Sequence, residues 1–303
     1  MRDMNMMLCG VPLKNPVIAA SGTFGFGEEY QTLFDVSRLG GIALKAVTKE
    51  PREGNPPPRI AETASGILNS IGLQNPGLDG FMQHELPFLK TLDTVLVANV
   101  AGKTVEDYCE VTEALSSLPE IDIIELNVSC PNVKEGCLSF GSTPDGVHDI
   151  TTAVKKHCKK PLMVKLTPNT TDIASNAKAA EEAGADAISL INTLTGMVVD
   201  VHTRRPILAN ITGGLSGPAI MPVALHMVHT VYKEVSIPVV GMGGIMSGED
   251  AIAFMLAGAS AVMVGTAGIA DSNAWLKITD EIGQYMEQHG IEKLQDIIGT
   301  LQY

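Results

Sequence analysis

Polar side chains recur in this sequence at the points where short apolar runs end. Lys45, Asn99, Asn127, Lys165 and Asn192 each close or directly follow such a run. An unpaired ammonium in a buried strand is costly unless an anionic or electron-rich group meets it. The alternative is that each lysine reaches solvent along its alkyl chain and each asparagine caps a loop. Five such residues at the same position in successive runs favour a shared binding site.

One cysteine lies beside these residues. Cys130 stands in the motif Asn127-Val-Ser-Cys-Pro-Asn132, a polar segment broken by proline, whereas Cys109 and Cys158 are expected inside a helix or strand. A nucleophilic cysteine normally works with a histidine. Of the seven histidines, His202 alone lies in a long segment from which it could approach, and a solvated position is the alternative. A thiol that only accepts a proton needs no such partner, so a role for Cys130 as a proton acceptor stays open.

Glycine-rich turns follow the last two apolar runs of the chain. They are Gly241-Met-Gly-Gly244 and Gly265-Thr266. Glycine lets backbone N–H groups come close to an anion, and barrels commonly bind phosphate at this position. Tight turns without a ligand are the alternative interpretation. A dinucleotide-binding fold is not indicated, because the first motif lacks the final glycine of the fingerprint and falls late in the chain.

The composition argues against several classes of protein. Among 303 residues, 34 are acidic and 21 are Lys or Arg, and a net charge of −13 repels nucleic acids and anionic lipid. No segment has the roughly twenty uninterrupted apolar residues of a membrane span, and no signal peptide is recognisable. The five cysteines include no CxxC pair, so no metal site or iron–sulfur cluster is expected on this chain. We therefore expect a cytoplasmic protein.

Eight short apolar runs are expected to be the strands that position these residues. Each run is apolar on both faces, as a parallel strand covered by helices must be. Eight such units over about 250 residues match an α/β fold of the (β/α)8 TIM-barrel type, and a doubly wound open sheet is the alternative. We expect a single barrel domain over residues 1–303, with strands at 17–20, 41–46, 95–100, 123–128, 162–166, 187–191, 238–241 and 261–265.

The stretches between the runs divide into helices and long loops. Two stretches, 49–80 and 193–217, exceed ordinary loop length, and both follow the carboxyl end of an expected strand. Long loops in a compact domain are usually functional, and barrels build their active sites at this end of the strands. Amphipathic patterns predict helices at 105–116, 146–156, 173–183, 218–232 and 249–256.

The motifs together resemble those of a known family. Several are specific in combination, although none is specific alone, and they run in order over nearly the full length. The chain resembles dihydroorotate dehydrogenase in the stretches Asn15-Pro-Val-Ile-Ala-Ala-Ser-Gly22, Ala43-Leu-Lys-Ala46, Asn69-Ser-Ile-Gly-Leu-Gln-Asn-Pro-Gly77, Asn127-Val-Ser-Cys-Pro-Asn132, Val164-Lys-Leu-Thr-Pro168 and Gly241-Met-Gly-Gly244. The resemblance implies a flavin-dependent (β/α)8 barrel that oxidises dihydroorotate to orotate in pyrimidine biosynthesis.

The resemblance also implies roles for matching positions. Cys130 would take a proton from dihydroorotate as hydride passes to the flavin. The residues implied to line the cofactor FMN are Ser21, Lys45, Ala46, Asn99, Asn127, Lys165, Ile191, Gly217, Gly243, Gly244, Gly265 and Thr266. Those implied to hold dihydroorotate and orotate are Lys45, Asn69, Ser70, Ile71, Gly72, Leu73, Asn127, Asn192 and Thr193.

The subfamily follows from two further features. Quinone-linked members carry an N-terminal helical extension and a serine base, whereas this chain has Cys130 and is similar to class 1. The stretches Gly25-Phe-Gly-Glu-Glu-Tyr30 and Arg59-Ile-Ala-Glu-Thr63 resemble the NAD-linked type. That resemblance implies a heterotetramer, in which a homodimer of the barrel carries a second subunit with FAD and a 2Fe–2S cluster, docked on an exposed apolar patch.

Three alternatives stay open at this point. The fumarate-linked homodimeric type of the same class is the first. A dihydropyrimidine dehydrogenase-type barrel, which also binds FMN and uses a cysteine, is the second. A catalytically silent FMN-binding regulatory barrel is the third, and it gives no reason for the position of Cys130.

Overall fold

The fold is a closed barrel of eight parallel strands. The computed structural model describes residues 2–129 and 140–303. Neighbouring strands pair in parallel, and the last pairs back with the first. This confirms the predicted TIM barrel, and the open-sheet alternative is wrong. In barrel order the strands are β3 (Val17–Ala19), β4 (Gly41–Ala43), β7 (Val95–Val100), β8 (Ile123–Asn127), β9 (Leu162–Lys165), β10 (Ala187–Leu190), β15 (Val239–Met242) and β16 (Ala261–Val264).

Every predicted apolar run forms one of these strands, and the predicted ends differ from the observed ones by no more than three residues. All residues of β4, β9, β10 and β16 are buried. Side chains on one face of each strand fill the barrel, and those on the other face pack against the helices. Both faces are therefore apolar, and polar and apolar residues do not alternate along the strand. The strands can be predicted because each one is marked in the sequence by its own continuous apolar run.

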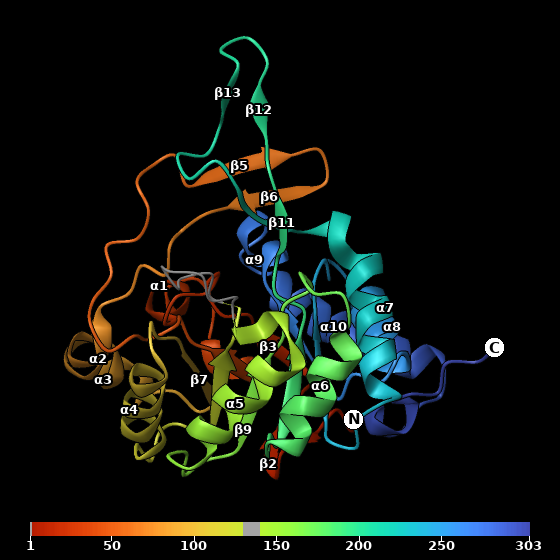
Figure 1. Cartoon of the computed structure of the whole chain (residues 1–303). Helices are drawn as coiled ribbons and strands as arrows, with labels where there is room; N and C mark the ends of the chain where they lie inside the picture. The colour runs from red at the N-terminus through yellow and green to blue at the C-terminus, as the bar shows by residue number, and fades with distance from the viewer. Residues whose placement is uncertain (1, 130–139) are drawn as a thin grey trace.

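Helices surround the barrel wall (Figure 1). The helix predicted at 105–116 is α4 (Val105–Ser116), which begins with a capping box formed by Thr104 and Asp107. The other four predicted helices are confirmed with ends shifted by at most two residues. They are α5 (Pro144–Lys155), α6 (Ile173–Glu182), η4 (Pro218–Ile220) continued by α7 (Met221–Tyr232), and α8 (Gly248–Leu256).

The last long helix, α10 (Ala274–Gln288), was not predicted. It buries Trp275, Ile278, Ile282 and Met286, whose spacing of three or four residues is typical of an amphipathic helix. The indole Nε1 of Trp275 donates to the carbonyl of Val264 at 2.9 Å and so attaches the helix to β16. A further expectation was wrong, since Cys158 lies beyond the end of α5 and not inside a helix or strand.

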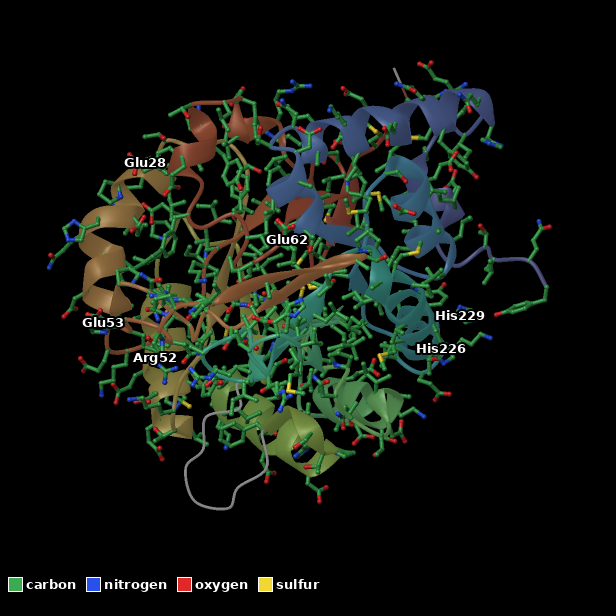
Figure 2. All side chains as sticks on the ribbon, turned by 90° about the horizontal axis from the view of Figure 1, so that it is seen from above. Glu28, Arg52, Glu53, Glu62, His226 and His229 are labelled. Carbon is green, nitrogen blue, oxygen red and sulfur yellow. The ribbon has the colours of Figure 1, made fainter. Side chains whose placement is uncertain are left out.

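The two long stretches expected as loops contain strands, so that expectation was wrong in part. β5 (Ile60–Thr63) and β6 (Gly66–Asn69) come from the first, and β11 (Leu194–Gly196) and β14 (Gly213–Ser216) from the second. They form one antiparallel sheet in the order β11-β14-β6-β5, here called the inserted sheet. Seen from above, β5 and β6 cross the middle of the molecule, with Glu62 near its centre (Figure 2).

A two-stranded hairpin extends beyond the inserted sheet, at the top of Figure 1. It consists of β12 (Val199–Asp200) and β13 (Arg205–Pro206) and is here called the projecting hairpin. Exposed apolar side chains gather on it and next to it: Met197, Val199, Val201 and Ile207. Large apolar groups in solvent commonly mark an interaction surface.

The remaining elements complete the outer layer. β1 (Met6–Leu8) and β2 (Val11–Leu13) form a separate hairpin before the barrel. In the described part of the chain, no helix has the length and apolar character needed to cross a membrane. The short helical elements are α1 (Glu28–Gln31), η1 (Val36–Arg38), α2 (Gly77–Gly80), η2 (Phe81–Glu85), α3 (Leu86–Leu89), η3 (Phe140–Ser142), α9 (Thr266–Ala270) and η5 (Leu294–Ile297).

Candidate active site

The carboxyl ends of three neighbouring strands bring predicted site residues together. Asn127, the last residue of β8, is the register partner of Lys165, the last residue of β9, so their side chains lie on the same face of the wall. Two residues beyond β10, Asn192 donates from Nδ2 to Oδ1 of Asn127 at 3.5 Å. These three residues form one polar cluster at the barrel rim.

Lys45 adds a cation at the end of β4. Its backbone N–H donates to the carbonyl of Gly25 at 2.9 Å, which fixes the chain where it leaves the strand. Burial lowers the pKa of the Lys45 side chain, and no charged group among the described residues counters that effect. An ammonium that is half-buried without a counter-ion is a binding point for an anionic ligand.

Three other predicted residues lie close to Lys45 or to the first strand. Ser21 donates from Oγ to the carbonyl of Leu44 at 2.8 Å, so the ends of β3 and β4 are joined beside the lysine. Ala46 follows and is buried. A Cβ added to Gly265 would lie 3.4 Å from Cβ of Ala20. The predicted cofactor-lining residues therefore continue around the rim from β4 through β3 to β16.

Glycines from two separate segments meet beside Thr266 through Gly217, and the group is here called the glycine cradle: Gly217, Gly243, Gly244 and Thr266. Gly217 and Gly244 have φ angles of 96° and 76°, which residues other than glycine rarely adopt. A Cβ on Gly244 would lie 2.8 Å from the carbonyl oxygen of Gly217, and one on Gly217 would lie 3.3 Å from Cγ2 of Thr266.

The cradle also contacts the end of β10. A Cβ on Gly243 would lie 3.4 Å from Cγ1 of Ile191, the predicted apolar lining residue, which is itself buried. Backbone N–H groups exposed in such a turn can bind a phosphate.

The inserted sheet carries the predicted substrate-binding segment. Asn69, at the end of β6, donates from Nδ2 to the carbonyl of Gly214 on β14 at 3.2 Å. Thr193 lies against the same strand, because a Cβ on Gly214 would be 2.0 Å from Oγ1 of Thr193. The pairing of β6 with β14 thus brings together two predicted residues that are far apart in sequence.

Residues 70–73 follow Asn69 and lead back toward the barrel. Ser70 is buried, and its Oγ accepts a hydrogen bond from Nδ2 of Asn55 at 2.9 Å. Ile71 accepts one from the backbone N–H of Asn55 at 3.0 Å. Gly72 and Leu73 have φ angles of 78° and 56°, so the chain turns sharply here. The structure fixes the backbone of this predicted segment through Asn55, a residue that sequence analysis did not single out.

A buried polar network inside the barrel includes two further residues that sequence analysis did not single out. Glu125 on β8 is fully buried and accepts hydrogen bonds from Asn99 and Ser189. Its Oε2 also lies 3.7 Å from Nζ of Lys165. A signal was present in the sequence, since Glu125 interrupts an otherwise apolar run, but a single charge in a strand did not distinguish it from a solvent-facing residue.

The predicted base, Cys130, lies outside the described residues. Among the described thiols, burial raises the pKa of Cys9 to about 12 and also raises the pKa values of Cys109 and Cys158. These thiols are therefore poor proton acceptors at neutral pH.

Three of the histidines, described next, lie away from the barrel rim. His202 is exposed in the turn of the projecting hairpin. His226 and His229 belong to α7 at the edge of the molecule (Figure 2). Residues 2–129 and 140–303 contain no group of three His, Cys, Asp or Glu side chains that could hold a metal ion.

A pocket of about 300 Å³ opens beside the inserted sheet rather than over the polar cluster. Leu68, Met197 and Leu215 are among the residues that line it, and none of the predicted site residues does. We assign the site from the convergence of the polar cluster, Lys45 and the glycine cradle, because these groups carry the charges and donors that chemistry needs.

Comparisons with known proteins identify the family of the chain. The family profile of dihydroorotate dehydrogenase matches residues 4–286. The chain is 56% identical over 300 residues to the protein named dihydroorotate dehydrogenase B (NAD(+)), catalytic subunit, of Alkaliphilus oremlandii, covering 99% of both chains. It is 50% identical to the protein of the same name from Bacteroides fragilis, covering all of both chains.

A solved structure shares the fold. The crystal structure of a DHODH from Eimeria tenella in complex with ferulenol superposes with a TM-score of 0.82 at 26% identity, covering 98% of this chain and 88% of that one. The resemblance noted in the motifs is thereby confirmed. The chain belongs to the dihydroorotate dehydrogenase family, as a catalytic subunit of its NAD-linked B type.

Proposed function

We propose that this chain oxidises dihydroorotate to orotate in pyrimidine biosynthesis, with FMN as its cofactor and Cys130 as the general base. The observation that carries the proposal is the convergence, at one barrel rim, of a cation with no counter-ion among the described residues, a cluster of amides and a glycine cradle. An anionic, amide-edged ring and a phosphate-bearing cofactor need these three features together.

The described residues fit FMN. The cradle is built so tightly that a Cβ on Gly217 or Gly244 would collide with neighbouring backbone, so only glycine fits there and no side chain covers the backbone N–H groups of these turns. Gly265 directly precedes Thr266 of the cradle. Inside the barrel, Oδ1 of Asn99 is buried and has no hydrogen-bond partner among the described residues, so it can accept from a ring N–H. Ser21, Lys45, Ala46, Asn127, Lys165 and Ile191 would line the ring and ribityl chain.

The substrate would lie between the polar cluster and the inserted sheet. Lys45 binds its carboxylate through a charge-assisted hydrogen bond. Asn69, Asn127, Asn192 and Thr193 supply amide and hydroxyl groups that match the donors and acceptors of the ring, and residues 70–73 close this side through Ser70, Ile71, Gly72 and Leu73. Bound FMN supplies the hydride acceptor.

The reaction removes a hydride and a proton from dihydroorotate. We assign the proton to the thiolate of Cys130, which follows the cluster residue Asn127 by three positions. Asn127 is held by its own contacts, since its Oδ1 accepts from the N–H of Ser129 at 3.1 Å. A positioned base of this kind is typically worth about 10² to 10⁴ in rate.

The NAD-linked type implies a partner for electron transfer. The relatives are named catalytic subunits, and we propose a heterotetramer in which a homodimer of this chain carries subunits with FAD and a 2Fe–2S cluster. The exposed apolar side chains Met197, Val199, Val201 and Ile207 are proposed as the docking patch. We further propose that residues 1–303 are one FMN-binding domain and that the enzyme is cytoplasmic.

One experiment tests the proposed function and its alternatives. The purified chain should show a flavin spectrum that bleaches when dihydroorotate is added anaerobically. It should reduce artificial acceptors but not NAD until the partner subunit is added. Bleaching by dihydrouracil in place of dihydroorotate, or rapid reoxidation by fumarate, would favour the dihydropyrimidine or fumarate-linked alternatives. A yellow protein that is bleached by neither would be a silent flavin-binding barrel.

A further inference from the structure

A carboxylate is fully buried inside the barrel, one strand away from a buried lysine. Glu125 has 0% of its surface exposed, and the Lys165 side chain has 7%. Their nearest atoms, Oε2 and Nζ, are 3.7 Å apart. A buried charge is retained only when it is paired and hydrogen-bonded, because desolvation of either ion alone is costly.

The carboxylate itself is held from two other strands. Asn99 on β7 donates from Nδ2 to Oε2 at 2.5 Å, and Ser189 on β10 donates from Oγ to Oε1 at 2.8 Å. Asn99 is the register partner of Glu125, and Ser189 is the register partner of Lys165. The four side chains therefore occupy the inside of four consecutive strands.

This arrangement leaves Glu125 little freedom. Both of its oxygens are bonded, so neither the carboxylate nor Asn99 can turn without breaking a contact. The side chain of Lys165 has four flexible methylene groups. It is held in one conformation only when its ammonium has a binding partner. Glu125 supplies that partner below the rim.

We propose that Glu125 is a positioning residue, whose clamped carboxylate holds the ammonium of Lys165 and the amide of Asn99 toward the cofactor ring. This inference rests on the proposed function for its ligand but not for its geometry. Glu125 itself reaches the ring only through these two side chains. Lys165 held in this way favours the negative charge that reduction adds to the ring.

The test is a double-mutant cycle of Glu125→Gln and Lys165→Gln in the full chain. Glutamine keeps the shape of Glu125: its amide oxygen can accept from Nδ2 of Asn99, and its amide nitrogen can donate to the hydroxyl of Ser189. In the FMN-loaded protein, we expect E125Q to lower the flavin midpoint potential toward that of K165Q, and to slow reduction by dihydroorotate by about 10²-fold. In the K165Q background, E125Q should produce no further shift.

The thermal stability of the cofactor-free chain gives a second cycle. Either single substitution leaves a buried group without its partner, so the double variant should be less destabilised than the sum of the two. The stability cycle tests the contact between Glu125 and Lys165 independently of the proposed function. A wild-type chain that binds no FMN would refute the proposed function, while the stability cycle would still decide whether Glu125 holds Lys165.

Two results would overturn the positioning role. One is a potential in E125Q that rises or stays unchanged, which would make Glu125 a background charge at most. The other is an equal shift with and without Lys165. Glu181→Gln is the matched control, because the Glu181 carboxylate on α6 is also a hydrogen-bond acceptor, here from the backbone N–H of Ser236 at 2.9 Å, but lies outside the barrel. It should leave the potential unchanged.

Discussion

Thr266 donates a hydrogen bond from its hydroxyl to the hydroxyl of Ser216 at 3.0 Å. Thr266 begins α9, separated by one residue from the last barrel strand, and Ser216 ends β14 of the inserted sheet. The contact joins the glycine cradle to the sheet that carries Asn69. The proposed cofactor and substrate sites thus share a wall, and a disturbance of the cradle is expected to reach both.

The cradle itself can be tested at Gly244. Replacing it with alanine puts a Cβ 2.6 Å from Cβ of Met221, at a φ of 76°. Overpacking costs about 1–3 kcal/mol, so the FMN dissociation constant, measured by flavin fluorescence, should rise about 10-fold or more. Gly10→Ala is the control, because Gly10 also has a positive φ but nothing within 4 Å. An equal loss of affinity in both variants would contradict a specific role for the cradle.

Cys130 is tested by two substitutions. Cys130→Ala should keep FMN and lose nearly all turnover at neutral pH, since a positioned base contributes about 10² to 10⁴ in rate. Cys130→Ser should retain some activity that increases at high pH, because a hydroxyl is a much weaker base than a thiolate. Anaerobic stopped-flow reduction of the flavin by dihydroorotate measures both. Near-normal reduction in the alanine variant would refute the assignment.

Lys45 gives a prediction about pH. Burial lowers its pKa from the ordinary 10.5, and the anion binds only the protonated form. Orotate affinity is therefore complete below the lowered pKa and is lost as pH rises through it, at a lower pH than an exposed lysine would require. Orotate titrations followed by flavin absorbance should show this loss in the wild type.

Lys45→Ala should weaken orotate binding by about 1.5–3 kcal/mol at neutral pH and abolish the alkaline transition. Lys49→Ala is the control, because Lys49 is an exposed partner of Glu110 at 2.7 Å. An unchanged dissociation constant in the Lys45 variant would mean that its ammonium simply reaches solvent.

The packing of α10 on the barrel predicts that alanine substitutions at two glycines change the stability of the chain in opposite directions. A Cβ on Gly268 would lie 1.9 Å from the ring of Trp275, which is fully buried, so Gly268→Ala should destabilise the chain by about 1–3 kcal/mol. Gly283, inside α10, has only Met4 Sδ nearby, at 4.0 Å. Gly283→Ala should stabilise by roughly 0.5–1 kcal/mol through helix propensity. Thermal unfolding of the two variants decides this, and a shift of the same sign in both would contradict it.

Local patterns account for what could be predicted from the sequence. Each barrel strand is a buried apolar run, and the rim residues Lys45, Asn127, Lys165 and Asn192 follow from where those runs end. The inserted sheet could not be read in this way, because β6 finds its partner β14 about 145 residues later and the pairing leaves no local signature.

Other omissions have different causes. The spacing of Trp275, Ile278 and Ile282 in α10 is a local helical signal that does lie in the sequence. The role of Glu125 could not be read, since its meaning depends on Asn99, Ser189 and Lys165 from three other strands. Cys130 stays a prediction from sequence.

The inserted sheet has a consequence for how such a barrel can be altered. β6 pairs with β5 on one side and with β14 on the other, so its two neighbours come from different insertions. Removing the segment that holds β14 would expose one side of β6 and its unpaired backbone groups. The two insertions therefore form one transplantable module, which has to be gained, lost or grafted onto another barrel as a pair.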